Sequence, residues 1–307
     1  MRILYIDKIK KTCNYYKDIV VALKLDHDVL VVNDNKDLVN KINKFKADII
    51  IIGFGVSSGE KKGFLKINLE VDIPTYVILN KEYTQLKEKL DWIKSIKPPV
   101  KKVFSVHHDV LKYQEYCNIP FTRIMWSADD KIFKQYDNNY TTDLFFSGVI
   151  REEQTDNIRE KIYNKLKELE KYKLMIKVSH FKNKKLSNKL YTLSNEEYAR
   201  AINDSKIALT TTGPVDIVGT RYFEIMAVNK ALIMCNRMPE EIYEDIVIDK
   251  MNCVMFDDEN DFIEKCKYYL EHEEERKEIV NNAYKYFLER HMWKHKITHL
   301  IDNLGGA

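Results

Sequence analysis

The chain carries an arginine and a glutamate three residues apart, Arg221 and Glu224, near the start of a predicted helix. This helix is expected to begin at Gly219-Thr220 and to lead into the apolar run 231–235, which has the character of a buried strand. Residues three apart on a helix project to one side, and a helix N-terminus offers free N–H groups to an anion. Arginine suits phosphate oxygens, and a carboxylate one turn later can accept hydrogen bonds from two neighbouring hydroxyls. The pair alone is also typical of a surface ion pair, but the flanking pattern favours a nucleotide-sugar site.

The same segment resembles the R-x-F-E signature of GT-B glycosyltransferases, in the group 1 set that includes the CgeB-like family, through Arg221, Phe223 and Glu224. The resemblance covers most of residues 140–300. It is weaker in the N-terminal half, where only the order of elements and a few junctions match. The resemblance implies that Glu224 holds the ribose of the donor nucleotide and that no divalent metal is needed. The chain departs from the family at Asn229, where a glycine is usual, but asparagine tolerates the same left-handed backbone.

Apolar runs alternate with helical patterns in both halves of the chain, which predicts an α/β fold. The run 48–53 is apolar on both faces, as strands of a parallel sheet are. In the first half, strands are expected at 3–6, 29–32, 49–52, 75–79, 102–106 and 122–126, and helices at 37–45, 83–96 and 109–116. In the second half, strands are expected at 143–148, 174–178, 207–211 and 231–235. Three helices are expected: one at 154–171, one that starts at the capping box of Ser194 and Glu197 and ends at 203, and one that starts at 219.

Two such domains match the GT-B architecture, in which two Rossmann-like domains face a central cleft and the C-terminal helix crosses back to the N-terminal domain. Trp293 is expected to pack at the interdomain junction. The predicted organisation is an N-terminal acceptor domain at 1–130, a linker at 131–142, a C-terminal donor domain at 143–290, and a returning helix at 291–307.

The composition is that of an ordinary globular protein and argues against a nucleic-acid-binding, membrane-spanning or zinc-binding protein. Lys and Arg number 50 against 47 Asp and Glu, a net charge of +3, which gives no strong case for binding nucleic acid or a membrane. Five cysteines without a C-x-x-C fit a reducing compartment and show no zinc spacing. The N-terminus reads as a strand, and no apolar stretch reaches 18 residues. We therefore expect a cytoplasmic protein, or a viral one active in a host cytoplasm.

Residues at the carboxyl ends of predicted strands are the candidate donor ligands, because open α/β sheets bind ligands at that edge. Gly148 would let the backbone approach a diphosphate closely. The resemblance implies basic residues after this glycine. Each basic candidate is also typical of a solvated surface charge. The donor-binding candidates are Gly148, Arg151, Arg159, Gly213, Gly219, Thr220, Arg221 and Glu224.

The catalytic base is the least determined part of the site. Deprotonation of an acceptor hydroxyl suits a carboxylate or histidine, and imidazole titrates near working pH. The candidates at the strand ends of the first half are His107, His108 and Glu82, and capping or local hydrogen bonding explains either histidine equally well. Adjacent residues on a strand point to opposite faces, so the two histidines are not expected to bind one metal. No metal site is predicted.

The leading hypothesis is a metal-independent glycosyltransferase that moves a sugar from a nucleoside-diphosphate sugar, UDP- or GDP-linked, to the hydroxyl of a glycan or another acceptor. A catalytically degenerate, nucleotide-sugar-binding partner subunit is one alternative, because the base is unassigned. A DNA-base glycosyltransferase is another, although the near-neutral charge argues against it. An NAD-dependent oxidoreductase is disfavoured, because no G-x-G-x-x-G follows an N-terminal strand. The sugar, the acceptor, the stereochemical outcome and the oligomeric state remain open.

Overall fold

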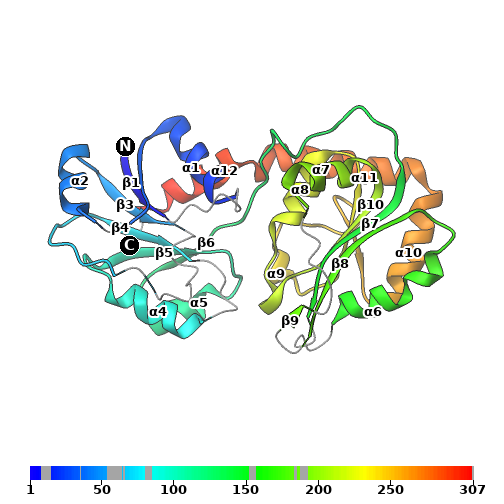
Figure 1. Cartoon of the computed structure of the whole chain (residues 1–307), viewed down its shortest axis with the longest axis horizontal. Coiled ribbons are helices and arrows are strands. Elements are labelled where there is room, and N and C mark those ends of the chain that lie inside the picture. The colour runs from blue at the N-terminus through cyan, green and yellow to red at the C-terminus, as the bar shows by residue number, and fades with distance from the viewer. Residues whose placement is uncertain are drawn as a thin grey trace. The chain divides into compact units, whose positions relative to one another are not determined.

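The chain folds into two compact units, each built around its own sheet (Figure 1). The computed structural model describes residues 1–7, 15–34, 36–53, 64, 66–79, 85–151, 157–182, 185–186 and 193–305. The first unit comprises Met1–Trp126 together with Trp293–Ala307, and the second comprises Ser127–Met292. The chain therefore leaves the first unit once and returns to it at its C-terminal end.

The first unit is a six-stranded sheet in the order β2-β1-β3-β4-β5-β6, with all paired strands parallel. Its central strands are buried on both faces, as in Ile49–Ile52, where all four residues are buried. Side chains of α2, α4 and α5 share one core cluster with one face of this sheet. The strands are β1 Arg2–Ile6, β2 Asp28–Val32, β3 Ile49–Ile52, β4 Thr75–Ile78, β5 Val100–Ser105 and β6 Phe121–Arg123, and the helices are α1 Tyr15–Asp26, α2 Leu38–Phe45, α4 Leu86–Ser95 and α5 Val110–Cys117.

The C-terminal helix α12, Trp293–Asp302, completes the first unit and lies beside α1 (Figure 1). Three polar contacts fix its end to the sheet. The Tyr76 hydroxyl donates to the Leu304 carbonyl over 2.7 Å, and Lys102 Nζ donates to the Asn303 carbonyl over 2.7 Å. Nε2 of His299 lies 3.2 Å from the Arg123 carbonyl oxygen. A C-terminal helix that packs on the N-terminal sheet is the arrangement expected of the GT-B fold.

The second unit holds a six-stranded sheet in the order β12-β11-β10-β7-β8-β9, parallel except for the short β9, which is antiparallel to β8. Residues 131–142, predicted as a linker, lie within this unit, where Asn203 accepts from the Tyr136 amide over 2.7 Å. The strands are β7 Thr142–Arg151, β8 Leu174–Lys182, β9 Lys185–Leu186, β10 Ser205–Thr210, β11 Leu232–Asn236 and β12 Val254–Phe256. The helices are α6 Ile158–Lys165, η1 Leu166–Leu169, α7 Asn195–Asn203, η2 Pro214–Asp216, α8 Thr220–Val228, α9 Glu240–Tyr243, α10 Glu259–Glu271, α11 Glu273–Tyr286 and η3 Phe287–His291.

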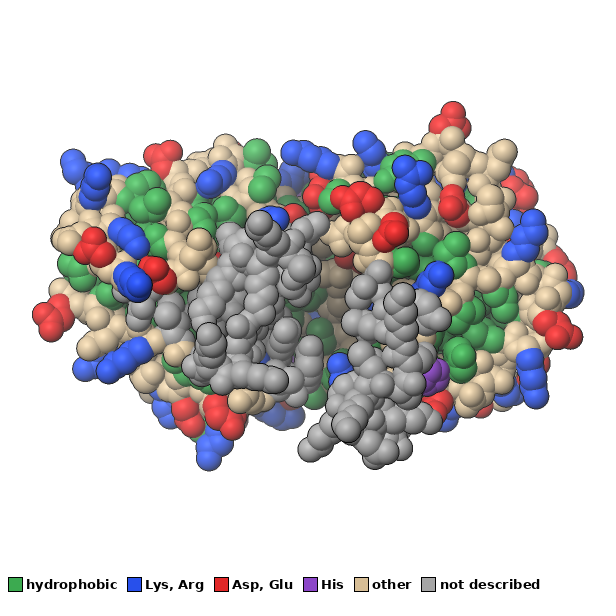
Figure 2. Space-filling model, in the orientation of Figure 1, with side chains coloured by type: hydrophobic (Ala, Val, Ile, Leu, Met, Phe, Trp, Pro, Cys, Tyr) green, Lys and Arg blue, Asp and Glu red, His purple; other side chains and the backbone are tan. Residues whose placement is uncertain are grey.

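Surface charge is mixed over both units. On the face drawn in Figure 2, basic and acidic side chains are interspersed over the described surface rather than gathered by sign. This matches the near-balance of the composition. None of the helices in the described ranges has the length and apolar character needed to span a bilayer.

Candidate functional site

The carboxyl ends of β7 and β10 and the start of α8 meet at one edge of the second sheet. β7 and β10 are paired in parallel, so both strands end on the same side. α8 follows β10 after the loop 211–219, in which the Gly213 amide donates to the Ile217 carbonyl over 2.7 Å and closes the turn. The first turn of α8 therefore returns to the strand ends. This is the edge at which parallel α/β sheets bind ligands.

Two guanidinium groups face the backbone of Gly148 at this edge. Gly148 has φ +150°, a conformation that side-chain-bearing residues rarely adopt. A Cβ at this position would lie 3.2 Å from Nη1 of Arg221 and 3.7 Å from Nη1 of Arg159. The ion pairs in the described part of the second unit engage other cations, such as Arg237 with two aspartates. Two close arginines over an open backbone are an arrangement suited to an anion.

Arg159, from α6, ties the ends of the two strands together. Its Nε donates to the Thr211 hydroxyl over 2.5 Å, and its Nη1 donates to the Val149 carbonyl over 3.1 Å. Its Nη2 donates to the carbonyls of Thr211 and Thr212, each over 3.2 Å. Burial lowers the pKa of Arg159 to about 10, and the nearby charge of Arg221 also lowers it, so the guanidinium stays charged at neutral pH. Most of the N–H groups of Arg159 are therefore hydrogen-bonded within the protein, while its positive charge remains at the site.

Replacement of Gly148 by alanine is expected to damage this geometry. The new Cβ would lie 3.2 Å from Nη1 of Arg221, so the guanidinium must shift slightly, and alanine at this φ costs about 1–3 kcal/mol of stability. We expect a lower melting temperature and weaker anion binding, measured by thermal unfolding and calorimetry. Gly305→Ala is the control, because no atom lies within 4 Å of its Cβ position and it lies in the first unit, away from this edge. Equal melting temperatures for Gly148→Ala and the wild type would contradict the expected strain.

The first two turns of α8 carry Thr220, Arg221 and Glu224. Gly219 is the N-cap residue of this helix, and no atom lies within 4 Å of the position that a Cβ would occupy there. Glu224 is partly exposed, yet its surroundings are dry enough that burial raises the pKa of Glu224 to about 7. A hydrogen bond from the Thr220 hydroxyl and the charge of Arg221 both act to lower that pKa. The carboxyl group is therefore about half ionised at neutral pH and can accept hydrogen bonds in its charged form.

The structure brings most of the predicted donor residues to this one edge. Arg151 is the last residue of β7. Its charge contributes to the lowered pKa of Arg159, so the two guanidinium groups lie near enough to interact electrostatically. Gly213 lies in the loop between β10 and α8 rather than against the two arginines. Glycine is conformationally required only at Gly148 in this set, because Gly213 and Gly219 have ordinary backbone angles.

Sequence reasoning missed Tyr198 and Ser147. Burial raises the pKa of Tyr198 to about 12, and the nearby side chains of Arg221 and Ser147 act in the opposite direction, so Tyr198 belongs to the surroundings of Arg221. The capping box of Ser194 and Glu197, which the sequence predicts, forms as expected and starts the helix that carries Tyr198. Nothing local marks this tyrosine among the 19 of the chain, because its partners come from distant segments.

The two candidate histidines, His107 and His108, make contacts with each other and with their sequence neighbours. His107 is 6% exposed, and its Nδ1 accepts from the Asp109 amide over 3.1 Å, so the proton of the neutral ring lies on Nε2. Its ring lies 4.2 Å from that of His108, centre to centre. Glu82 lies outside the described residues. The catalytic role of all three residues stays a prediction. No group of three potential metal ligands occurs within the described ranges.

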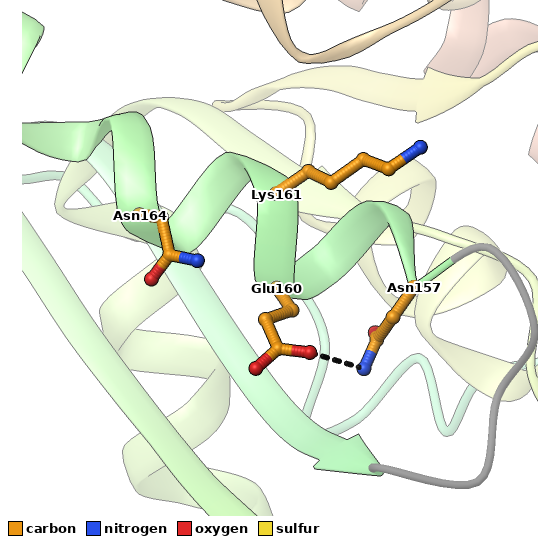
Figure 3. A pocket seen from close by; sticks show the side chains of 4 residues that line it. All are labelled: Asn157, Glu160, Lys161 and Asn164. Carbon is orange, nitrogen blue, oxygen red and sulfur yellow. Dashed lines mark hydrogen bonds between the residues drawn. The ribbon is translucent and has the colours of Figure 1, made fainter.

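A separate hollow of about 510 Å³ lies along α6 and is lined by Asn157, Glu160, Lys161 and Asn164 (Figure 3). Asn157 Nδ2 donates to Glu160 Oε2 over 3.3 Å, whereas Lys161 extends away from both. Helical spacing puts these four residues on the side of α6 opposite to Arg159. The hollow is therefore distinct from the edge at which the two arginines meet.

Comparison with known proteins gives this geometry a context. Residues 154–302 match the model of a family described as glycosyl transferase-like. No protein of curated function matches the sequence significantly. Solved structures with the same fold include the Anabaena protein Alr3699/HepE in complex with UDP-glucose, at 10% identity and a TM-score of 0.61 over 99% of each chain. A glycosyltransferase from Rickettsia africae has 11% identity and a TM-score of 0.65, over 99% of this chain and 97% of its own.

A third structure is the DNA-modifying enzyme β-glucosyltransferase, solved with and without uridine diphosphoglucose, at 14% identity and a TM-score of 0.64 over 99% of each chain. At these identities the likeness shows the fold, whereas the family match covers the segment that contains α6, α7 and α8. The chain therefore has the GT-B fold of these structures, and residues 154–302, just under half of its 307 residues, match a glycosyl transferase-like family.

Proposed function

We propose that the second unit binds a nucleoside-diphosphate sugar at the edge formed by β7, β10 and α8. The diphosphate lies over Gly148 and the start of α8 and is contacted by Arg221. Arg159 adds a second positive charge beside it. The ribose hydroxyls donate to Glu224. The observation that carries this proposal is the convergence of two guanidinium groups on Gly148, with a carboxylate one turn along the helix.

Charge stabilisation is the chemistry that this arrangement supplies. As the bond to the sugar breaks, negative charge develops on the departing diphosphate, and fixed positive groups stabilise that charge. Arginine and a helix N-terminus can do this without a metal ion, so we propose metal-independent transfer. Arg221 lies at the start of α8 and Glu224 one turn later, the order that the R-x-F-E signature requires. This order supports our proposal that the chain is related to the CgeB-like group.

The donor nucleotide proposed first is UDP. Structures with the same fold, such as that of HepE, were solved with UDP or UDP-glucose. The acceptor is proposed to be a hydroxyl compound that binds at the carboxyl ends of the first sheet. A base from among His107, His108 and Glu82 would remove the acceptor proton, and His108 is the more exposed of the two histidines.

A thermal-shift screen tests the proposal without knowledge of the acceptor. The panel contains UDP, GDP, CMP, ADP, dTDP, NAD and their sugar conjugates, each with and without EDTA. A ligand at a hundred times its dissociation constant stabilises the folded state by about 2.7 kcal/mol, which is a visible shift. We expect a shift with a nucleoside diphosphate that EDTA leaves unchanged. A shift with NAD alone, or none across the panel, would contradict the proposal.

A further inference from the structure

A chain of buried hydrogen bonds starts at the donor edge, the edge formed by β7, β10 and the start of α8. Its first member is Tyr222, which lies in the first turn of α8 directly after Arg221 and is fully buried. The hydroxyl oxygens of Tyr222 and Tyr243 lie 3.1 Å apart, and the Tyr243 hydroxyl donates to the Asn236 carbonyl over 2.6 Å. Asn236 is the last residue of β11, so these bonds connect the start of α8 to that strand end.

The side chain of Asn236 extends the hydrogen bonds to the loop after β10. Its Oδ1 accepts from the Thr212 amide over 3.1 Å. The Thr212 carbonyl in turn accepts from Nη2 of Arg159 over 3.2 Å. Asn236, Thr212 and Tyr243 are each at most 8% exposed, so their polar groups depend on partners within the protein. The bonds therefore join α8 to Arg159, the guanidinium that faces Gly148 from the other side of the edge.

The two tyrosine hydroxyls have fixed roles, because each carries a single proton. Tyr243 gives its proton to the Asn236 carbonyl, so in the pair the Tyr222 O–H donates and the Tyr243 oxygen accepts. Burial raises the pKa of both tyrosines well above the ordinary value, so both hydroxyls stay protonated. Loss of the Tyr243 hydroxyl would take the acceptor from a fully buried donor, whereas loss of the Tyr222 hydroxyl leaves the bond to Asn236 intact.

We propose that Tyr243 is a positioning residue of the donor edge, which holds the first turn of α8 at the ends of β10 and β11 through the Tyr222 hydroxyl. This assignment rests on the proposed function, because it presumes that the ligand binds at the first turn of α8. Tyr222 stands between Arg221 and Glu224 in the chain, so a displaced first turn would move both side chains. Fixing these groups in advance saves the cost of ordering them when the ligand binds. Loss of the anchor should therefore weaken contacts to the phosphates and to the nucleoside alike.

Calorimetric titration of UDP and of uridine into the wild type, Tyr222→Phe, Tyr243→Phe and the double variant tests this assignment. Phenylalanine keeps both rings, whose centres lie 5.8 Å apart, so only hydroxyls are lost. We expect both dissociation constants to rise about threefold in Tyr222→Phe and about tenfold in Tyr243→Phe, because a stranded buried donor costs more than a lost bond. In the double variant they should return to about threefold above the wild type, because the stranded proton is gone.

Tyr140→Phe is the matched control. It removes a hydroxyl that donates to the Lys230 carbonyl over 3.0 Å, at the end of β7 opposite to the donor edge. The control should melt at a lower temperature than the wild type and bind both ligands with wild-type affinity. All titrations are made below the onset of melting, where nearly all molecules are folded, so a loss of stability alone leaves the dissociation constants unchanged.

The double variant separates positioning from general damage, because damage accumulates whereas the stranded donor is relieved by the second substitution. Wild-type affinities in Tyr243→Phe, a double variant that binds more weakly than Tyr243→Phe, or an equal loss in Tyr140→Phe would each overturn the assignment. If Tyr243→Phe does not fold, Tyr222→Phe must still raise both dissociation constants above those of Tyr140→Phe. A wild-type protein that binds no nucleoside diphosphate would remove the proposed function itself, and the wild-type titration reveals this separately.

Discussion

Arg221→Gln is expected to weaken UDP binding by about a hundredfold or more, while uridine affinity changes little. Arg221 is the guanidinium nearest to the Gly148 backbone, and glutamine keeps much of the side-chain length but removes the charge. Arg159 cannot replace it, because most of its donors are already spent on Thr211, Thr212 and Val149. Calorimetry with UDP and uridine measures the effect.

Arg290→Gln is the matched control for this experiment. The Arg290 guanidinium is exposed and lies 3.0 Å from Asp245. Its replacement therefore removes the same charge as Arg221→Gln, but away from the donor edge. The control should bind UDP as the wild type does. If Arg221→Gln and Arg290→Gln weaken UDP binding equally, Arg221 acts only through the net charge of the protein and does not contact the diphosphate.

Glu224→Ala is expected to weaken binding of UDP and uridine alike by about tenfold to a hundredfold, because the ribose hydroxyls lose a charged acceptor. This pattern differs from that of Arg221→Gln, in which only the phosphate-bearing ligand is affected. The fold should be retained, because Glu224 is partly exposed at the start of a helix whose buried face is apolar. Unchanged uridine affinity in Glu224→Ala would remove Glu224 from the ribose site.

The raised pKa of Glu224 also predicts how binding depends on pH. Bound hydroxyls donate to the ionised carboxylate, so affinity for uridine and UDP should rise as pH increases through about 7. The folded protein without ligand should show the opposite slope. Its Glu224 pKa lies above the ordinary value of 4.5, so the folded state holds a proton that the unfolded chain has lost. The contribution of this group to stability is therefore full below about pH 4.5 and declines until about pH 7.

Glu224→Gln removes the titrating group and should flatten both of these pH profiles. The control is Glu278→Gln, at an exposed position of α11, which should leave both profiles as they are in the wild type. Profiles of Glu224→Gln that match the wild type would mean that another group produces the pH dependence.

The sequence was sufficient for features that depend on local pattern. The Arg221–Glu224 pair, the helix that carries it and the strand after it follow from residues within 20 positions of each other, and the structure forms α8 and β11 there. The parallel sheets follow from runs such as Ile49–Ile52 that are apolar on both faces. Local signals of this kind survive folding because tertiary packing reinforces them.

Features that depend on distant contacts could not be predicted in the same way. In the sequence, Arg159 is one basic residue among several. Its role in joining the two strand ends is seen only in its hydrogen bonds to Thr211 and Thr212, about 50 residues away in sequence. Tyr198 lies near enough to Arg221 for the charge of Arg221 to act on its pKa, because α7 packs against α8. The helix predicted at 154–171 is described from Ile158 and tightens at Leu166 into the single turn η1, a change that hydrophobic periodicity does not reveal.

The most direct test of the central claim is a crystal structure of the protein with UDP. The account predicts a diphosphate within hydrogen-bonding distance of the Arg221 guanidinium and the amides at the start of α8, and a ribose whose hydroxyls contact Glu224. UDP bound instead in the hollow along α6, or on the first unit, would contradict it.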